Sequence, residues 1–131
     1  MKLDYNCARD LLLLLENELK LTYAEYGIES NAIFFDDVAQ NLKKYRKEVI
    51  AYTTLKLDEA GYINVDCEYG DECYHNFAYY GITYQGHQYL DSVRSKSVWS
   101  KILSKSKATG LSLTFDVIKA VATKIITSDL I

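Results

Sequence analysis

The chain has 131 residues, of which 49% are hydrophobic and 25% are charged, so we expect a single globular domain and exclude a disordered chain. Its formal net charge of −3 argues against a dedicated non-specific nucleic-acid binder, because such proteins are normally basic. The longest apolar run, Leu11 to Leu15, is far shorter than the roughly 20 residues that span a bilayer, and the first residues do not resemble a secretory signal, so we expect a cytoplasmic protein.

The N-terminal segment has the pattern of an amphipathic helix capped by Asp4. Its apolar residues recur at helical spacing, at Ala8, Leu11, Leu12, Leu15 and Leu19. The pattern breaks at Gly27 and over residues 29–31, and residues 32–34 form a short candidate strand.

Two further helices are predicted next. Asp36 is expected to cap a short helix whose inward residues are Val38, Ala39 and Leu42. After a turn through Lys43 and Lys44, a longer helix runs from about Arg46 to Ala60, and Gly61 ends it. Its inward positions at helical spacing are Ile50, Thr53, Leu57 and Ala60.

Two strands are predicted beyond Gly61, over residues 62–66 and 78–82, because apolar and polar residues alternate there. A long polar loop around Gly70 and Asp71 separates them, so the pair is predicted to form a hairpin with a long tip. Thr83 stands where a helix needs a cap, and helical patterns follow at residues 89–93 and 98–103. Gly110 precedes a final helix, for which Ser112 is the expected cap.

The order of these elements (helix, short strand, two helices, strand, loop, strand) is that of a winged helix-turn-helix. We therefore predict an α+β fold, a winged helix with additional C-terminal helices. Residues 1–131 are expected to form one domain, with the winged-helix core at about 4–91 and a helical extension at about 92–131.

Three stretches strengthen this prediction. Residues 57–63, Leu-Asp-Glu-Ala-Gly-Tyr-Ile, are similar to the L-x-E-x-G-L-I pattern of many winged-helix proteins. Residues 82–99, with a Gly-His, a Leu-Asp and a Val-Trp pair, and residues 112–116, Ser-Leu-Thr-Phe-Asp, resemble the YjcQ-like family, a bacterial and prophage domain family of unknown function. The resemblance implies a winged-helix fold and a phage or prophage origin, but no activity. The chain departs from that family in its long acidic loop at residues 67–77 and in Tyr52, where relatives often have histidine.

The fold suggests binding to double-stranded DNA, through a recognition helix that needs cations near its N-terminus for phosphates. The predicted phosphate contacts are Lys43, Lys44, Arg46 and Lys47, and the residues predicted nearest the bases are Tyr52 and Lys56. Acidic residues near these positions argue against DNA binding, because they are repelled by phosphates. Those on the helix are Glu48 and Glu59, and those in the wing are Asp66, Glu68, Asp71 and Glu72.

A protein-interaction module without DNA binding is the alternative hypothesis. Its wing would present the aromatic residues Tyr69, Tyr74, Phe77 and Tyr79 as a recognition surface, unless these side chains instead close the core. The final helix has an apolar stripe from Phe115 to Ile126 that is wide enough for a homodimer contact or for packing on the first helix of the same chain.

No enzyme, cofactor or small-molecule substrate is predicted, because no phosphate loop or nucleophile motif is present. Cys67, Cys73 and His75, with His87 beyond them, are spaced too widely for a typical zinc site, so we expect no metal. Asp91 could orient His87, but no nucleophile accompanies the pair, and a structural histidine is expected. Cys7 is expected to be a small buried side chain.

Overall fold

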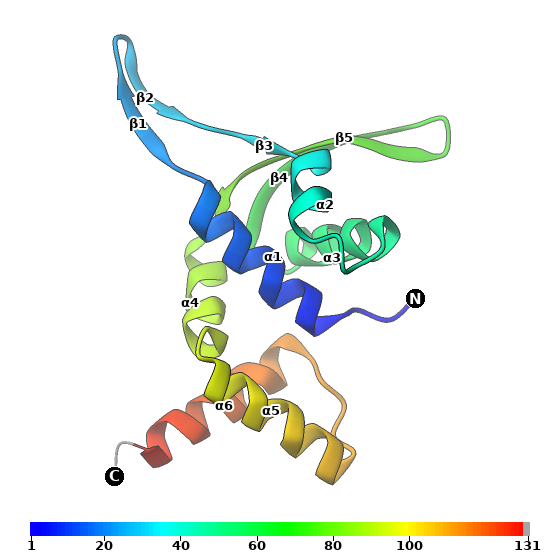
Figure 1. Cartoon of the computed structure of the whole chain (residues 1–131), viewed down its shortest axis with the longest axis vertical. Coiled ribbons are helices and arrows are strands. Elements are labelled where there is room, and N and C mark those ends of the chain that lie inside the picture. Colours follow the sequence, from blue (N-terminus) through cyan, green and yellow to red (C-terminus); the bar gives the residue numbers. More distant parts are fainter. Residues whose placement is uncertain (130–131) are drawn as a thin grey trace. The chain divides into compact units, whose positions relative to one another are not determined.

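The computed structural model describes residues 1–129 (Figure 1). The fold is mixed α+β, as predicted, and the described residues contain six helices, one two-stranded and one three-stranded antiparallel sheet. The chain separates into two compact units, one from Met1 to Gly86 and one that begins at His87. No helix in residues 1–129 is long and apolar enough to cross a membrane.

The first helix, α1 (Tyr5–Glu18), begins as predicted at Asp4, whose carboxylate accepts a hydrogen bond from the backbone N–H of Cys7 at 3.0 Å. This bond satisfies one of the free N–H groups at the start of a helix. The buried residues of α1 are Cys7, Ala8, Leu11, Leu12 and Leu15. They confirm the predicted stripe except for Leu19, which follows the end of the helix and is half-buried.

A hairpin that the sequence analysis missed follows α1. Strands β1 (Leu21–Ala24) and β2 (Gly27–Ser30) pair with each other alone and form a sheet of their own. The sequence pattern predicts only a break here, because each strand has four residues and the turn lacks the Asn-Gly or Asp-Gly signal of tight hairpins.

The short strand β3 (Ile33–Phe34) leads directly into α2 (Phe35–Asn41). The predicted cap of α2 was wrong: Phe34 occupies the cap position without a side-chain bond, and Asp36 lies in the first turn. A carboxylate there is still favourable, because it faces the positive end of the helix dipole.

The third helix, α3 (Lys47–Glu59), has the predicted inward residues except that Ala60 is exposed. Thr54, which was not predicted, is buried in its place. Its hydroxyl lies 2.9 Å from the carbonyl oxygen of Ile50, to which it donates, and 2.7 Å from the hydroxyl of Tyr79. Burial therefore leaves neither hydroxyl without a partner, as expected for polar groups inside a protein.

The antiparallel pairing of the two strands after Gly61 confirms the predicted hairpin, but its long polar tip was wrong. Strands β4 (Ile63–Gly70) and β5 (Cys73–Ile82) extend through it and are joined by only Asp71 and Glu72. Both turn residues have positive φ angles, 53° and 63°, which is the geometry of a type I′ turn. Strand β5 also pairs with β3, so the sheet order is β3-β5-β4.

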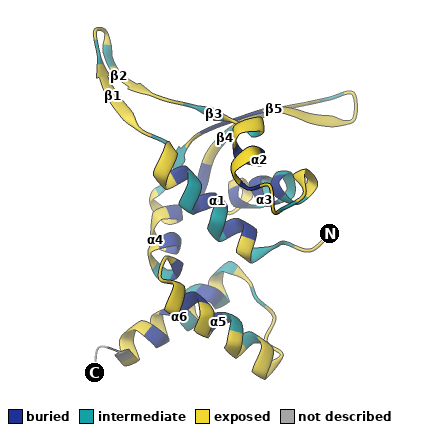
Figure 2. Cartoon of the chain, viewed as in Figure 1, coloured by how far each residue is buried: buried dark blue, intermediate teal, exposed yellow. Residues whose placement is uncertain are grey.

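The core of the first unit lies where α1 and α3 contact each other and where α1 contacts β5. Figure 2 shows the buried residues concentrated on these elements, whereas the ends of both hairpins are exposed. The fully buried side chains include Leu11, Ile50 and Tyr79. The core therefore holds α3 and the β4–β5 hairpin in fixed positions.

Helix α4 (Tyr84–Val93) begins against the start of β4. Thr83 caps it as predicted, because its hydroxyl accepts a bond from the N–H of Gly86 at 3.0 Å while it donates to the carbonyl of Gly61. A Cβ atom on Gly86 would overlap the carbonyl oxygen of Tyr62. Only glycine therefore fits this position without a shift of the backbone.

In the second unit, α5 (Lys96–Thr109) ends at Gly110, which adopts the left-handed conformation with φ of 66°. The final helix, α6 (Phe115–Asp129), is capped by Thr114, whose hydroxyl accepts from the N–H of Val117 at 3.1 Å, and not by Ser112 as predicted. Helices α5 and α6 contact each other. The buried apolar side chains of α6 are Ile118, Ala122 and Ile125.

Candidate nucleic-acid interface

The turn between α2 and α3 is fixed to α1 by a small polar cluster. The hydroxyl of Tyr45 donates to the carboxylate of Asp10 at 2.6 Å, and the ammonium of Lys44 lies 3.0 Å from the same oxygen. Burial, followed by the bond to Asp10, raises the pKa of Tyr45 above its ordinary value, so the hydroxyl stays a donor. The backbone that carries the cations of the α2–α3 turn is therefore held in place against α1.

Three of the predicted phosphate contacts surround one hollow of about 510 Å³ at this turn, namely Lys43, Arg46 and Lys47. All three side chains are exposed. Arg46 lies 3.9 Å from Glu48, but both side chains are mostly exposed, so this ion pair is weak. Among the described residues, Lys43 and Lys47 form no ion pair. The hollow is therefore the most cationic point of the predicted DNA surface, although Asp36 also lines it.

Tyr52 and Lys56, the residues predicted nearest the bases, lie apart from this hollow. The ammonium of Lys56 is 2.7 Å from a carboxylate oxygen of Glu59 and 5.3 Å from the centre of the Tyr52 ring. The bond to Glu59 raises the pKa of Lys56. Lys56 lies nine residues after Lys47, roughly 13 Å further along the helix. The predicted phosphate contacts thus lie at the start of α3, whereas Tyr52 lies near its middle and Lys56 in its last turn.

The β4–β5 hairpin presents acidic groups to solvent, because Asp66, Glu68, Asp71 and Glu72 are all exposed. Glu68 accepts a bond from the side-chain amide of Asn76 at 3.1 Å and lies 3.6 Å from His75. A negative hairpin is repelled by phosphates. The β4–β5 hairpin is therefore a poor contact for a DNA backbone.

The aromatic residues predicted for the wing divide into two groups. Phe77 and Tyr79 are buried in the core, whereas Tyr69 and Tyr74 are exposed, and their rings contact each other at a tilt of 54° with centres 4.8 Å apart. A groove of about 780 Å³ runs between the start of α3 and β5. Its lining includes Phe35 and Phe77 as well as Lys47 and His75, so it is mixed in character.

The candidate metal and catalytic residues do not assemble into a site. Within residues 1–129, no group of three or more His, Cys, Asp or Glu side chains could hold a metal ion. His87 is exposed. The proposed orienting acid, Asp91, instead forms a 2.6 Å ion pair with Arg94. Cys7 is buried as expected.

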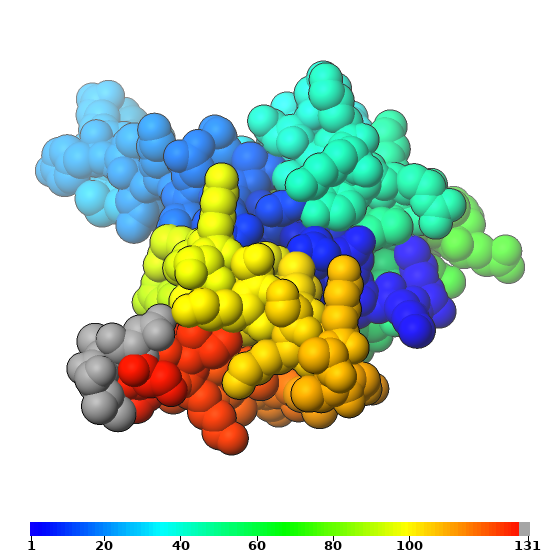
Figure 3. All heavy atoms as spheres, turned by 60° about the horizontal axis from the view of Figure 1, so that its bottom comes forward, coloured from blue at the N-terminus to red at the C-terminus, as the bar shows by residue number. Residues whose placement is uncertain are grey.

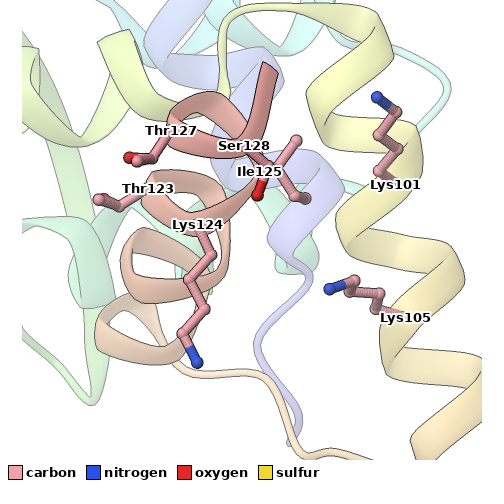
Figure 4. A pocket seen from close by; sticks show the side chains of 7 residues that line it. All are labelled: Lys101, Lys105, Thr123, Lys124, Ile125, Thr127 and Ser128. Atoms are coloured by element: carbon pink, nitrogen blue, oxygen red, sulfur yellow. The ribbon is translucent and has the colours of Figure 1, made fainter. Parts of the chain in front are cut away.

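The second unit contains a basic cleft. The cleft of about 550 Å³ lies between α5 and α6 (Figure 4) and is lined by Lys101, Lys105, Thr123, Lys124, Ile125, Thr127 and Ser128. Lysines recur along the sequence of α5, but nothing in the sequence pattern indicates that Lys124 of α6 lies beside them.

The two units differ strongly in charge. Residues 1–86 contain eight Lys and Arg against fifteen Asp and Glu, whereas residues 87–131 contain seven against three. The second unit is therefore basic, although the net charge of the whole chain is negative. This distribution weakens the argument that the net charge opposes a polyanionic partner.

Comparison with known families matches residues 2–112 to the family described as "Hypothetical protein (DUF2513)". The chain belongs to the DUF2513 family. The function of this family is unknown. The matched residues include the α2–α3 turn, both hairpins and α5, but they end before α6. The turn and the hairpins therefore lie within the part that defines DUF2513, whereas the α6 side of the basic cleft lies outside it.

The chain is also similar to an uncharacterized protein of Haemophilus influenzae, with 42% identity over 45 residues. This similarity covers 34% of the DUF2513 chain and 38% of the Haemophilus protein. No solved structure matches the chain.

Proposed function

We propose that this DUF2513 protein is a non-enzymatic winged-helix protein that binds duplex DNA as a regulator of prophage type. The proposal is supported by the order α1, β3, α2, α3, β4, β5 together with the sheet order β3-β5-β4. In a winged helix, the helix at the position of α3 enters the major groove. The YjcQ-like resemblance and a cytoplasmic site of action belong to the same proposal.

The observation that carries the proposal is the cationic hollow at the start of α3. Lys43, Arg46 and Lys47 surround it on an anchored turn, at the end of the helix that approaches the DNA backbone in helix-turn-helix proteins. Because the acidic β4–β5 hairpin is repelled by phosphate, we expect binding to rely on the turn and on α3 and not on the wing.

The test is fluorescence anisotropy of labelled duplex DNA at about 50 and about 200 mM salt, comparing the wild type with Lys43→Gln/Lys47→Gln. We expect the double variant to bind more weakly and its salt dependence to fall by about two units of slope, because two phosphate contacts are lost. The variant is not expected to unfold, since removing a cation at the start of α3 relieves repulsion by the helix dipole.

The matched control is Lys2→Gln/Lys20→Gln, which removes two exposed lysines elsewhere on the first unit and gives the same net charge. Equal losses in the two variants would assign the effect to overall charge and not to the hollow. Absence of binding by the wild type at low salt would overturn the proposal.

A protein-interaction module is the second candidate function. It is favoured by the exposed ring pair of Tyr69 and Tyr74 beside the mixed groove, because aromatic residues are enriched at protein interfaces. A homodimer through α6 remains a further proposal, although the buried positions of that helix are already used within the chain. Binding through aromatic contacts would respond weakly to salt, which separates it from DNA binding.

A further inference from the structure

The β1–β2 hairpin has one apolar and one polar face. Residues directly opposite each other in an antiparallel pair share a face, and the register pairs Tyr23 with Ile28 and Leu21 with Ser30. Tyr23, Ile28 and Leu21 therefore lie together on one face. The other face carries Thr22 opposite Glu29.

The apolar face is uncovered in the single chain. The exposed fractions are 72% for Leu21, 87% for Tyr23 and 63% for Ile28, and Tyr26 in the turn is 94% exposed. In the space-filling view, the hairpin (light blue) stands clear of the atoms of α2 (cyan) (Figure 3). A two-stranded hairpin alone is marginally stable in water and needs a packing partner, and clustered exposed apolar side chains indicate an interaction surface.

The base of the hairpin is held in place from both sides. The amide side chain of Asn31 donates to the carbonyl of Glu18 at 3.0 Å and accepts from the backbone N–H of Lys20. The hydroxyl of Ser30 donates to the carbonyl of Tyr80 at 3.4 Å. The hairpin is thus oriented before it meets a partner, which lowers the entropy that binding must overcome.

The charge of the hairpin disfavours a polyanionic partner. Between residues 21 and 30 the charged residues are Glu25 and Glu29, both acidic and exposed. Nucleic acid and anionic lipid surfaces would therefore be repelled. The partner must offer an apolar surface of similar size and must not place a carboxylate against the apolar face.

We propose that the partner is a second copy of this chain, bound apolar face to apolar face around a two-fold axis. Such a symmetric interface uses the same patch on both copies, so an apolar face is matched by an identical one. Glu29 lies on the opposite face of each hairpin, so like charges do not meet across the axis. The two hairpins would stack about 10 Å apart, as packed sheets do.

The size of the patch sets the expected strength. Leu21, Tyr23, Tyr26 and Ile28 together offer on the order of 500 Å² on each copy. The total of about 1,000 Å² lies at the lower end of specific interfaces, where complexes are weak or transient. We therefore expect a dimer with a dissociation constant in the micromolar range. This inference goes beyond the proposed DNA binding and does not depend on it.

The test is sedimentation equilibrium of the full chain up to about 200 μM, comparing Tyr23→Lys with Thr22→Lys. These variants add the same charge at neighbouring positions of β1 but on opposite faces. We expect Tyr23→Lys to raise the dimer dissociation constant by at least about tenfold, because it buries an unpaired charge. Thr22→Lys should leave the constant almost unchanged. Circular dichroism checks that both variants are folded.

A second measurement keeps the proposal testable if Tyr23→Lys does not fold. In a Cys67→Ser/Cys73→Ser background, Ile28→Cys should be cross-linked between copies by a bifunctional maleimide that spans roughly 10 Å, the distance between stacked sheets. Glu29→Cys should not, because Glu29 lies on the opposite face of the hairpin. A wild type that stays monomeric over the whole concentration range would overturn the proposal. Equal weakening by the two lysine variants, or equal cross-linking by the two cysteine variants, would do the same.

Discussion

Single residues show how burial changes the chemistry of side chains in the first unit. Cys7 is fully buried in α1, and burial raises the pKa of its thiol to about 11 from the ordinary 9.0. An acid with a raised pKa in the folded state holds its proton longer than the same group in the unfolded chain. This difference couples the stability of the protein to alkaline pH.

We predict that the stabilising effect of the neutral Cys7 thiol is fully present below pH 9.0 and is lost as the pH rises through about 11. The melting temperature of the wild type should therefore fall more steeply between pH 9.0 and about 11 than that of Cys7→Ala. Parallel pH profiles for the two proteins would show that the thiol does not contribute. Tyr79 also has a raised pKa owing to burial, but it is present in both proteins and cancels in the comparison.

At the far end of α3, Glu59 is predicted to limit DNA affinity. It holds Lys56 at 2.7 Å and places a carboxylate on the face proposed to meet DNA. Glu59→Gln frees the cation and removes a repulsive charge, so we expect DNA affinity to rise by up to about fivefold, the scale of exposed charge interactions. Anisotropy measures this, with Glu25→Gln on the β1–β2 hairpin as the matched control. No gain over the control would place Lys56 outside the DNA contact.

Among the elements, α4 shows a physical reason for the Thr-x-x-Gly spacing of Thr83 and Gly86. The threonine caps the helix and also bonds to Gly61, which draws the helix start so close to Tyr62 that a side chain at Gly86 has no room. We predict that Gly86→Ala destabilises the protein by about 1–3 kcal/mol, as overpacking does. Gly81→Ala is the control, because its Cβ would meet only the amide of Asn64 at an ordinary 3.8 Å. Denaturant unfolding measures both, and equal effects would contradict the steric argument.

In the β4–β5 turn, by contrast, a substitution is predicted to stabilise the protein. Glu72 adopts a φ of 63°, which costs a residue with a side chain about 1 kcal/mol relative to glycine. Glu72→Gly creates the Asp-Gly pair that type I′ turns prefer. We therefore expect the melting temperature to rise, by an amount corresponding to about 0.5–1 kcal/mol. A decrease would indicate that the entropy of glycine in the unfolded chain outweighs the relief of strain.

The sequence predicted some elements better than others for definite reasons. Helix α3 and the start of α1 were placed within about a residue because apolar residues repeat over three or more turns. The end of α1 was not, because the pattern was expected to break only at Gly27, whereas the helix ends at Glu18. The β1–β2 hairpin was missed because its strands are short and mostly exposed, and the β4–β5 turn because non-glycine residues occupy positive φ angles. The cations of the candidate site were evident from their clustering in the sequence. Their anchoring through Asp10 was not, because it depends on a contact between residues 35 positions apart.

For the whole molecule, the uneven charge between the two units has a measurable consequence. The basic cleft of α5 and α6 is predicted to attract polyanions even though the chain is acidic overall. Lys105→Gln/Lys124→Gln should elute from immobilised heparin at lower salt than the wild type and should reduce the salt slope of DNA binding by up to about two. Lys2→Gln/Lys20→Gln again controls for net charge. Identical elution of the two double variants would remove the cleft from the binding surface.

The β1–β2 hairpin also affects how the protein behaves at high concentration. Each strand pairs on one side only, so the outer edges of both strands present free backbone N–H and C=O groups next to an apolar face. Open edges of this kind template the addition of further strands and lead to aggregation. Face-to-face stacking in the dimer would cover the apolar side chains but leave these edges open, so the edges need protection of another kind. Solubility on storage and during expression should therefore depend on the same ten residues, and a lysine on the polar face at Thr22 should act as a gatekeeper against fibril growth.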